Sequence, residues 1–96
     1  MKKGTFIIRT INGFKEVDGY IHQIETLKFG FHKHKNEWIV TELYTGCALP
    51  GSDKTRKDAL EHAEEEYKEI FDTIASNNEQ INKMYEELKE YKKTKE

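Results

Sequence analysis

The chain has 96 residues, of which 35% are apolar and 35% charged, and its formal net charge is −2. This length predicts a single domain over residues 1–96 and excludes a second hydrophobic core. The eleven aromatic residues exclude the composition of a disordered chain. No apolar run approaches the roughly 18 residues of a membrane span, and the single cysteine, Cys47, cannot form an internal disulfide. We therefore expect a cytoplasmic protein without a membrane segment.

Residues 1–51 have the composition of short strands separated by turns. The Asn12-Gly13 pair is a strong hairpin signal, and further turns are predicted at Asp18-Gly19, Lys35-Asn36, Thr45-Gly46 and Pro50-Gly51. The predicted strands are Thr5–Ile11, Phe14–Val17, Tyr20–Glu25, Lys28–His34, Trp38–Tyr44 and Cys47–Leu49. We therefore predict an antiparallel sheet of three to five strands.

Alternation along two of these strands predicts which face is buried. Phe29 and Phe31 share one face of their strand, while Lys28, His32 and His34 share the other. In the next strand Trp38 and Val40 share a face that also includes Glu42. The core is expected on the aromatic side.

Residues 55–94 are predicted to be helical. Thr55 followed by Asp58 resembles a capping box and places the start of the helix near Arg56. Apolar residues then recur at spacings of three and four as far as Tyr91, in the same phase on both sides of Asn77. The fold class predicted is α+β, with one long C-terminal helix bent near Asn77. The alternative is that the helix bends at Ser76–Asn78 and folds its tail back onto the sheet, which gives a monomer.

The far half of such a helix extends beyond what a small sheet can cover. Its apolar side chains would then need a partner outside the chain, and a coiled-coil homodimer is predicted. The residues expected to form that interface are Ile81, Met84, Leu88 and Tyr91.

The segment 58–79 carries eight acidic residues against one base, Lys68. A solvated helix face is the simplest interpretation. A face that repels itself is better explained by a basic protein partner, such as a nuclease with a basic groove. The contacts expected on this hypothesis are Glu61, Glu64, Glu65, Glu69 and Asp72.

Basic residues at the helix start suggest an alternative, nucleic-acid-binding function. Cations are disfavoured at a helix N-terminus unless an anion is bound nearby. With the basic residues of the sheet, the candidate contacts are Lys28, His32, Lys33, Lys35, Lys54, Arg56 and Lys57.

Catalysis and metal binding are not expected. His32 and His34 have a spacing that metal sites use, and Cys47 and His22 could add ligands. Neighbouring lysines oppose a divalent cation, however, and no spacing assembles Cys47 with a base and an orienting group. We predict no metal, no cofactor and no enzymatic activity.

The stretch Lys28–Ala63 resembles small phage and prophage accessory proteins of the anti-CRISPR and anti-defence type. The residues that carry this resemblance are Gly30-Phe31-His32-Lys33, Trp38 through Gly46, and Lys54 through Leu60. The resemblance implies a curved antiparallel sheet followed by a packing helix. It also implies stoichiometric inhibition of a host defence nuclease in the host cytoplasm, without catalytic residues.

The stretch Gly51 through Ala59 is similar to the helix start that follows the sheet in double-stranded-RNA-binding domains and in integrase arm-binding domains. The first family has a helix before its sheet, and Gly4–Val17 is not helical in pattern. The second has a strongly basic sheet face, whereas this chain is net acidic. The nucleic-acid function therefore remains the alternative. A structural or regulatory homodimer is the third hypothesis.

Overall fold

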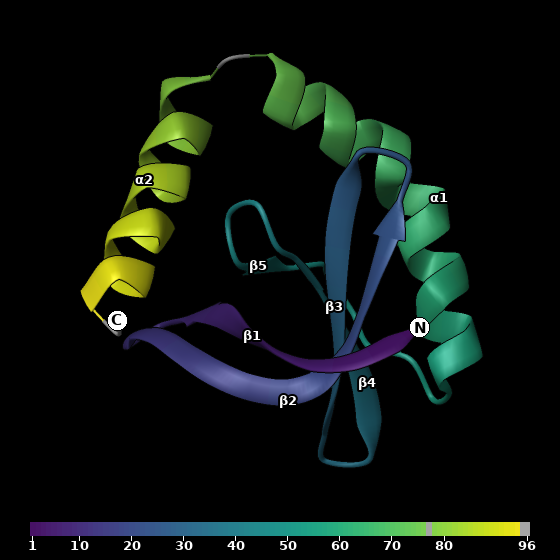
Figure 1. Cartoon of the computed structure of the whole chain (residues 1–96). Coiled ribbons are helices and arrows are strands. Elements are labelled where there is room, and N and C mark those ends of the chain that lie inside the picture. The colour runs from purple at the N-terminus through teal and green to yellow at the C-terminus, as the bar shows by residue number, and fades with distance from the viewer. Residues whose placement is uncertain (77, 95–96) are drawn as a thin grey trace.

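The computed structural model describes residues 1–76 and 78–94. Within these ranges a five-stranded antiparallel sheet is followed by two helices, which confirms the predicted α+β class (Figure 1). The sheet has the simple meander order β1-β2-β3-β4-β5. The elements are β1 (Lys2–Thr10), β2 (Gly13–Ile24), β3 (Leu27–His34), β4 (Glu37–Glu42), β5 (Cys47–Ala48), α1 (Arg56–Ala75) and α2 (Glu79–Thr94).

Tight turns connect the first four strands, and the sequence predicts two of these turns. Thr10 pairs with Gly13, so that the β1–β2 loop contains only two residues, and Gly13 has a φ of 120°. His34 pairs with Glu37 across Lys35 and Asn36, whose φ values are 50° and 65°. Two left-handed residues match the twist that a two-residue hairpin requires. The turn at Lys35-Asn36 is confirmed. The hairpin predicted at Asn12-Gly13 is also present, but its loop residues are Ile11 and Asn12, and Gly13 begins β2.

The prediction of a turn at Asp18-Gly19 is wrong, because β2 runs without a break from Gly13 to Ile24. A Cβ atom at Gly19 would collide with the carbonyl oxygen of Phe31, and one at Gly30 would lie 2.5 Å from the ring of Phe6. These glycines allow the backbone and an aromatic ring to approach closely inside the sheet. Gly19 marks close packing rather than a chain reversal.

The sheet curls until its two outer strands meet. Figure 1 shows β1 and β2 running across β3 and β4 in a strong curve. The backbone N–H of Arg9 in β1 donates to the carbonyl of Gly46, just before β5, over 2.7 Å. Trp38 at the start of β4 exchanges two backbone hydrogen bonds with Asp53, which leads the chain toward α1.

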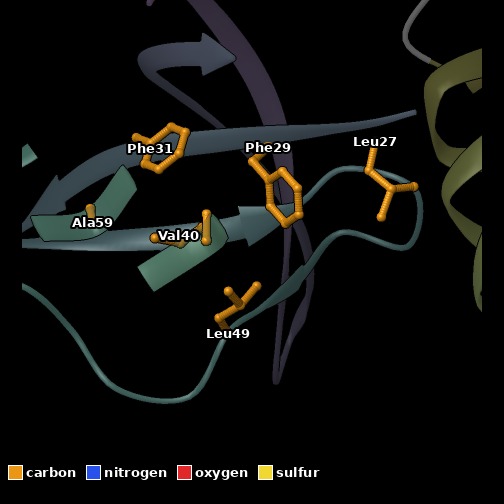
Figure 2. Close-up of a cluster of buried hydrophobic side chains, with 7 residues drawn as sticks. Leu27, Phe29, Phe31, Val40, Leu49 and Ala59 are labelled. Atoms are coloured by element: carbon orange, nitrogen blue, oxygen red, sulfur yellow. The ribbon is translucent and has the colours of Figure 1, made fainter. Parts of the chain in front are cut away.

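The main core lies between the inner face of the sheet and α1. Figure 2 shows Phe29, Phe31 and Val40 of the sheet beside Ala59 of α1. Phe29, Phe31 and Ala59 are 0% exposed. Burying a side chain of phenylalanine size contributes ~1.5–3 kcal/mol, so this cluster fixes the position of α1. The face predicted from the Phe29–Phe31 spacing is confirmed.

The prediction of one long C-terminal helix is wrong. Helix α1 begins at Arg56, as the capping pattern predicts, with the Asp58 N–H donating to Thr55 Oγ1 over 3.1 Å. It ends at Ala75, and Asn78 Oδ1 accepts a hydrogen bond of 2.7 Å from the Gln80 N–H at the start of α2.

The alternative, a tail folded back toward the sheet, is confirmed, and Figure 1 shows the two helices as the sides of an arch. The apolar residues of α1 and α2 keep the same spacing because both helices turn their apolar sides toward the sheet. The bend predicted near Asn77 concerns a residue outside the described ranges.

Candidate functional site

The first candidate surface is the acidic face of α1, formed by Glu61, Glu64, Glu65, Glu69 and Asp72. All five side chains are exposed, and none forms an ion pair within residues 1–76 and 78–94. The last turn of α1 has no basic residue, so Asp72 lies toward the negative end of the helix dipole without compensation. The predicted residues therefore share one surface, which carries five carboxylates against one base, Lys68.

The acidic face continues into a hollow of about 340 Å³ beside the first turns of α1. Asp58, Glu61 and Glu65 line it together with Asp53 and His62. His62 Nδ1 lies 2.9 Å from Asp53 Oδ2, which joins the start of α1 to the segment after β5. The hollow offers an acidic recess rather than a flat charged surface.

The predicted nucleic-acid-binding residues lie on β3, in the β3–β4 turn and at the start of α1. Two of them, Lys33 and Arg56, join an aromatic–basic patch with Tyr20 and Trp38. Arg56 lies 4.1 Å over the ring of Tyr20, and Lys33 lies 5.9 Å from the ring of Trp38. The two ring centroids are 6.0 Å apart. A hollow of about 500 Å³ adjoins the patch and adds Lys3 to its lining.

The other predicted basic residues belong to the same elements or to the segments next to them. Lys28 is at the opposite end of β3 from Lys33, and Lys35 is in the β3–β4 turn. Lys54 and Lys57 are exposed, one before α1 and one in its first turn. The pairing of Arg56 with Tyr20 was not predicted from the sequence. Its signal was available only as an aromatic residue on a strand and a cation at a helix start.

His32 is half-buried and packs edge-on against Phe6 at 6.0 Å between ring centroids. Burial first, and then the charges of His34 and Lys15, lower the pKa of His32. Its Nδ1 atom is buried without a hydrogen-bond partner. His32 therefore belongs to the packing beneath the sheet surface. In the described part of the chain no three metal-ligating side chains are grouped together.

The predicted dimerisation residues contact the rest of this chain. Leu88 is 2% exposed, and the ring of Tyr91 lies 5.0 Å from that of Phe14. Ile81 and Met84 line a cavity between the helices. The premise that these four residues have no partner within the chain is therefore wrong, whereas self-association itself stays a prediction.

Arg9 attaches α2 to the sheet. Its guanidinium donates to the Met84 carbonyl over 2.9 Å, to the Thr45 carbonyl over 3.2 and 3.3 Å, and to Glu87 Oε1 over 3.0 Å. The same group lies 4.7 Å over the Phe14 ring. One side chain of β1 thus connects the β4–β5 turn with α2.

The third candidate surface is the interhelical cavity, of about 310 Å³, between α1, α2 and the β4–β5 segment. Glu42 lies in its lining and is 5% exposed. Its carboxylate accepts hydrogen bonds from the Tyr44 N–H, the Thr45 N–H and, over 2.7 Å, the Thr45 hydroxyl. Burial raises the pKa of Glu42, while these hydrogen bonds lower it, and burial prevails. The placement of Glu42 on the inner face of its strand is confirmed.

No family model, curated protein or solved structure matches the chain. Within the described residues no helix combines the length and the apolar character needed to cross a membrane.

Proposed function

We propose that this chain is a non-catalytic, stoichiometric binding protein whose acidic face docks on a basic protein surface. The observation that carries this proposal is the row of five exposed carboxylates without ion pairs among the described residues of the chain. A basic groove that normally holds nucleic acid has the complementary charge. In keeping with the resemblance to anti-defence proteins, the partner proposed is a host defence nuclease in the cytoplasm.

The spacing of the acidic face supports an extended contact. Residues four apart on a helix are about 6 Å apart along its axis, so Glu61, Glu65 and Glu69 form a row along α1. Complementary charge accelerates encounter and disfavours wrong partners. The hollow beside Asp58 and Glu61 adds a recess that a lysine or arginine side chain of the partner could enter.

Charge reversal tests this proposal. Glu61→Lys, Glu65→Lys and Asp72→Lys together should abolish capture of the partner from a bacterial lysate and should abolish inhibition of the captured nuclease. The matched control reverses three exposed acids outside α1, Glu16→Lys, Glu86→Lys and Glu90→Lys, and should retain both. Circular dichroism verifies the fold of each variant. Capture that survives reversal on α1, or a captured protein without nucleic-acid-binding activity, contradicts the proposal.

A second candidate function is supported by the aromatic–basic patch. Flat rings with cations beside them are the features on which single-stranded nucleic acids stack, and this binding weakens steeply with salt. The guanidinium of Arg56, held over Tyr20, would present its remaining N–H groups to a phosphate. A homodimer remains a third hypothesis without a specific contact in its favour.

Fluorescence anisotropy with a labelled oligo-dT at low and moderate salt tests the second function. Lys33→Ala with Arg56→Ala should abolish binding, while Lys28→Ala with Lys57→Ala removes the same charge and should weaken it only slightly. Equal losses from the two pairs would mean that general charge, rather than the patch, attracts the strand.

A further inference from the structure

The interhelical cavity has an apolar lining from all three of its walls. Helix α1 contributes Ile70 and Ile74, α2 contributes Ile81 and Met84, and the segment after β4 contributes Leu49 and Pro50. Its volume of about 310 Å³ is at the lower end of the roughly 300–1,000 Å³ typical of small-molecule sites. Figure 1 shows the enclosing elements, with β5 beneath the arch of the two helices. The cavity is thus suited to the apolar body of a small ligand.

The position of α2 keeps this space from being filled by the chain itself. Arg9 holds the Met84 carbonyl at 2.9 Å, and Tyr85 stacks on Tyr44 with ring centroids 4.3 Å apart. These contacts attach α2 to β1 and to the turn between β4 and β5. The two helices border an open hollow and do not pack closely against each other.

The polar groups of the cavity have one sign of charge. Glu42 lies buried in the lining, and Glu66 and Glu69 line it from α1. None of the described lining residues is a lysine, an arginine or a histidine. Arg9 donates to carbonyls of Thr45 and Met84, which are lining residues, and its charge is paired with Glu87 at 3.0 Å. Apolar walls with the carboxylates of Glu66 and Glu69, and without a base among the described lining residues, favour a positively charged ligand.

We infer that the interhelical cavity binds a small organic cation, an apolar body that ends in one ammonium group. The apolar body lies against Ile70, Ile74 and Met84, and the ammonium group lies beside Glu66 and Glu69. Glu42 also lies in the lining, where its carboxylate accepts hydrogen bonds from Tyr44 and Thr45. This inference is independent of the proposed function, because it needs no protein partner and uses only Glu69 of the acidic face.

The direct test titrates the protein with n-hexylammonium, n-hexanol and n-hexanoate, and follows backbone amides by ¹H–¹⁵N NMR. The three probes share the same apolar chain and differ in the charge of the end group. Hexylammonium should shift the amides of Thr73, Ile74, Ile81 and Met84, bind more tightly than hexanol, and lose affinity with added salt. Hexanoate should bind most weakly. Equal binding of the alcohol and the ammonium, or shifts centred outside these residues, overturns the inference.

Two pairs of variants separate the cavity from general surface charge. Glu66→Gln with Glu69→Gln should weaken hexylammonium binding about two- to five-fold, as expected for partly exposed ion pairs. Glu64→Gln with Glu65→Gln removes the same charge from α1 outside the cavity and should leave affinity unchanged. Thr73→Trp fills the cavity from an exposed position and should abolish binding, while Lys68→Trp should not. Equal effects within either pair contradict the assignment of the site.

Discussion

The two helices have the same apolar spacing but are attached to the sheet in different ways. Helix α1 places Ala59 and Ala63, both 0% exposed, directly on β3 and β4, where small side chains allow close approach. In α2 the buried residue is Leu88, and long side chains make the other contacts with the sheet. Apolar periodicity therefore shows which side of a helix faces the protein. It does not show how closely the helix packs.

This difference predicts two levels of stability. Helix α1 should unfold with the sheet, because its core cluster is continuous with Phe29, Phe31 and Val40. Helix α2 should detach locally at a lower free energy, since few buried apolar contacts hold it. The predictions below test this contrast, in order of decreasing effect.

The largest effect is expected for Ala63→Leu, which inserts three carbon atoms where α1 meets the sheet. Overpacking of a closed core typically costs about 1–3 kcal/mol, and we expect the upper end because Ala63 is 0% exposed. Urea denaturation should show a lower midpoint. The control Ala75→Leu, at the exposed last residue of α1, should change the midpoint little. Equal midpoints for the two variants would mean that α1 is not rigidly packed.

Arg9→Gln should release α2 while α1 stays in place. The substitution removes the charged hydrogen bonds to Met84, Thr45 and Glu87, and a loss of about 2 kcal/mol is expected. Hydrogen exchange of α2 amides should then accelerate about 30-fold. Arg56→Gln is the matched control, because it removes a cation from an aromatic ring near α1. Acceleration throughout the chain would show that α2 is part of the cooperative unit.

A smaller local effect is expected for Tyr85→Leu, which removes the stacking of Tyr85 on Tyr44. Such aromatic pairs contribute about 0.5–1.5 kcal/mol beyond area burial, and Tyr85 is 36% exposed, so the lower end applies. Exchange should accelerate in α2 alone. Phe71→Leu removes the corresponding pair with Tyr67 on α1. If Phe71→Leu accelerates hydrogen exchange in α2 as much as Tyr85→Leu does, α1 and α2 do not differ in stability as proposed.

The smallest effect is a pH dependence from His32. Because the folded-state pKa of His32 is lowered from 6.5, the unfolded chain binds more protons as the pH falls through about 6.5. The contribution of neutral His32 is therefore complete above that value and is lost on acidification. Denaturation midpoints measured from pH 7.5 to 5.5 should fall less in His32→Gln than in the wild type. An identical fall would assign the effect to other groups.

The sequence predicted features that depend on neighbouring residues. The hairpin turn at Asn12-Gly13, the helix start at Thr55 and the shared face of Phe29 and Phe31 each follow from residues close together in the chain. The fold-back of the C-terminal helix was only the alternative, because the segment has no glycine or proline and the apolar phase continues across it. The Asn78 side chain caps the start of α2, and the spacing of apolar residues gives no information about such a cap.

Features created by the curl of the sheet were not predictable in this way. Gly19 resembled a turn residue because its close neighbour, the Phe31 carbonyl, comes from a different strand. The same holds for the candidate site. All five acids of the acidic face lie within one helix, so the sequence alone places them on one surface. The aromatic–basic patch requires residues from β2, β3, β4 and α1 to come together.

The hydrogen bond from Arg9 to Gly46 has a consequence for aggregation. Unpaired strand edges are templates on which other chains can add as further strands. In this sheet the end of β1 is paired with the segment before β5, and the other end of β1 begins with Lys2 and Lys3, whose charges oppose the approach of another strand. The curl that shapes the core thus also limits recruitment of neighbouring molecules, which would favour solubility during synthesis at high local concentration.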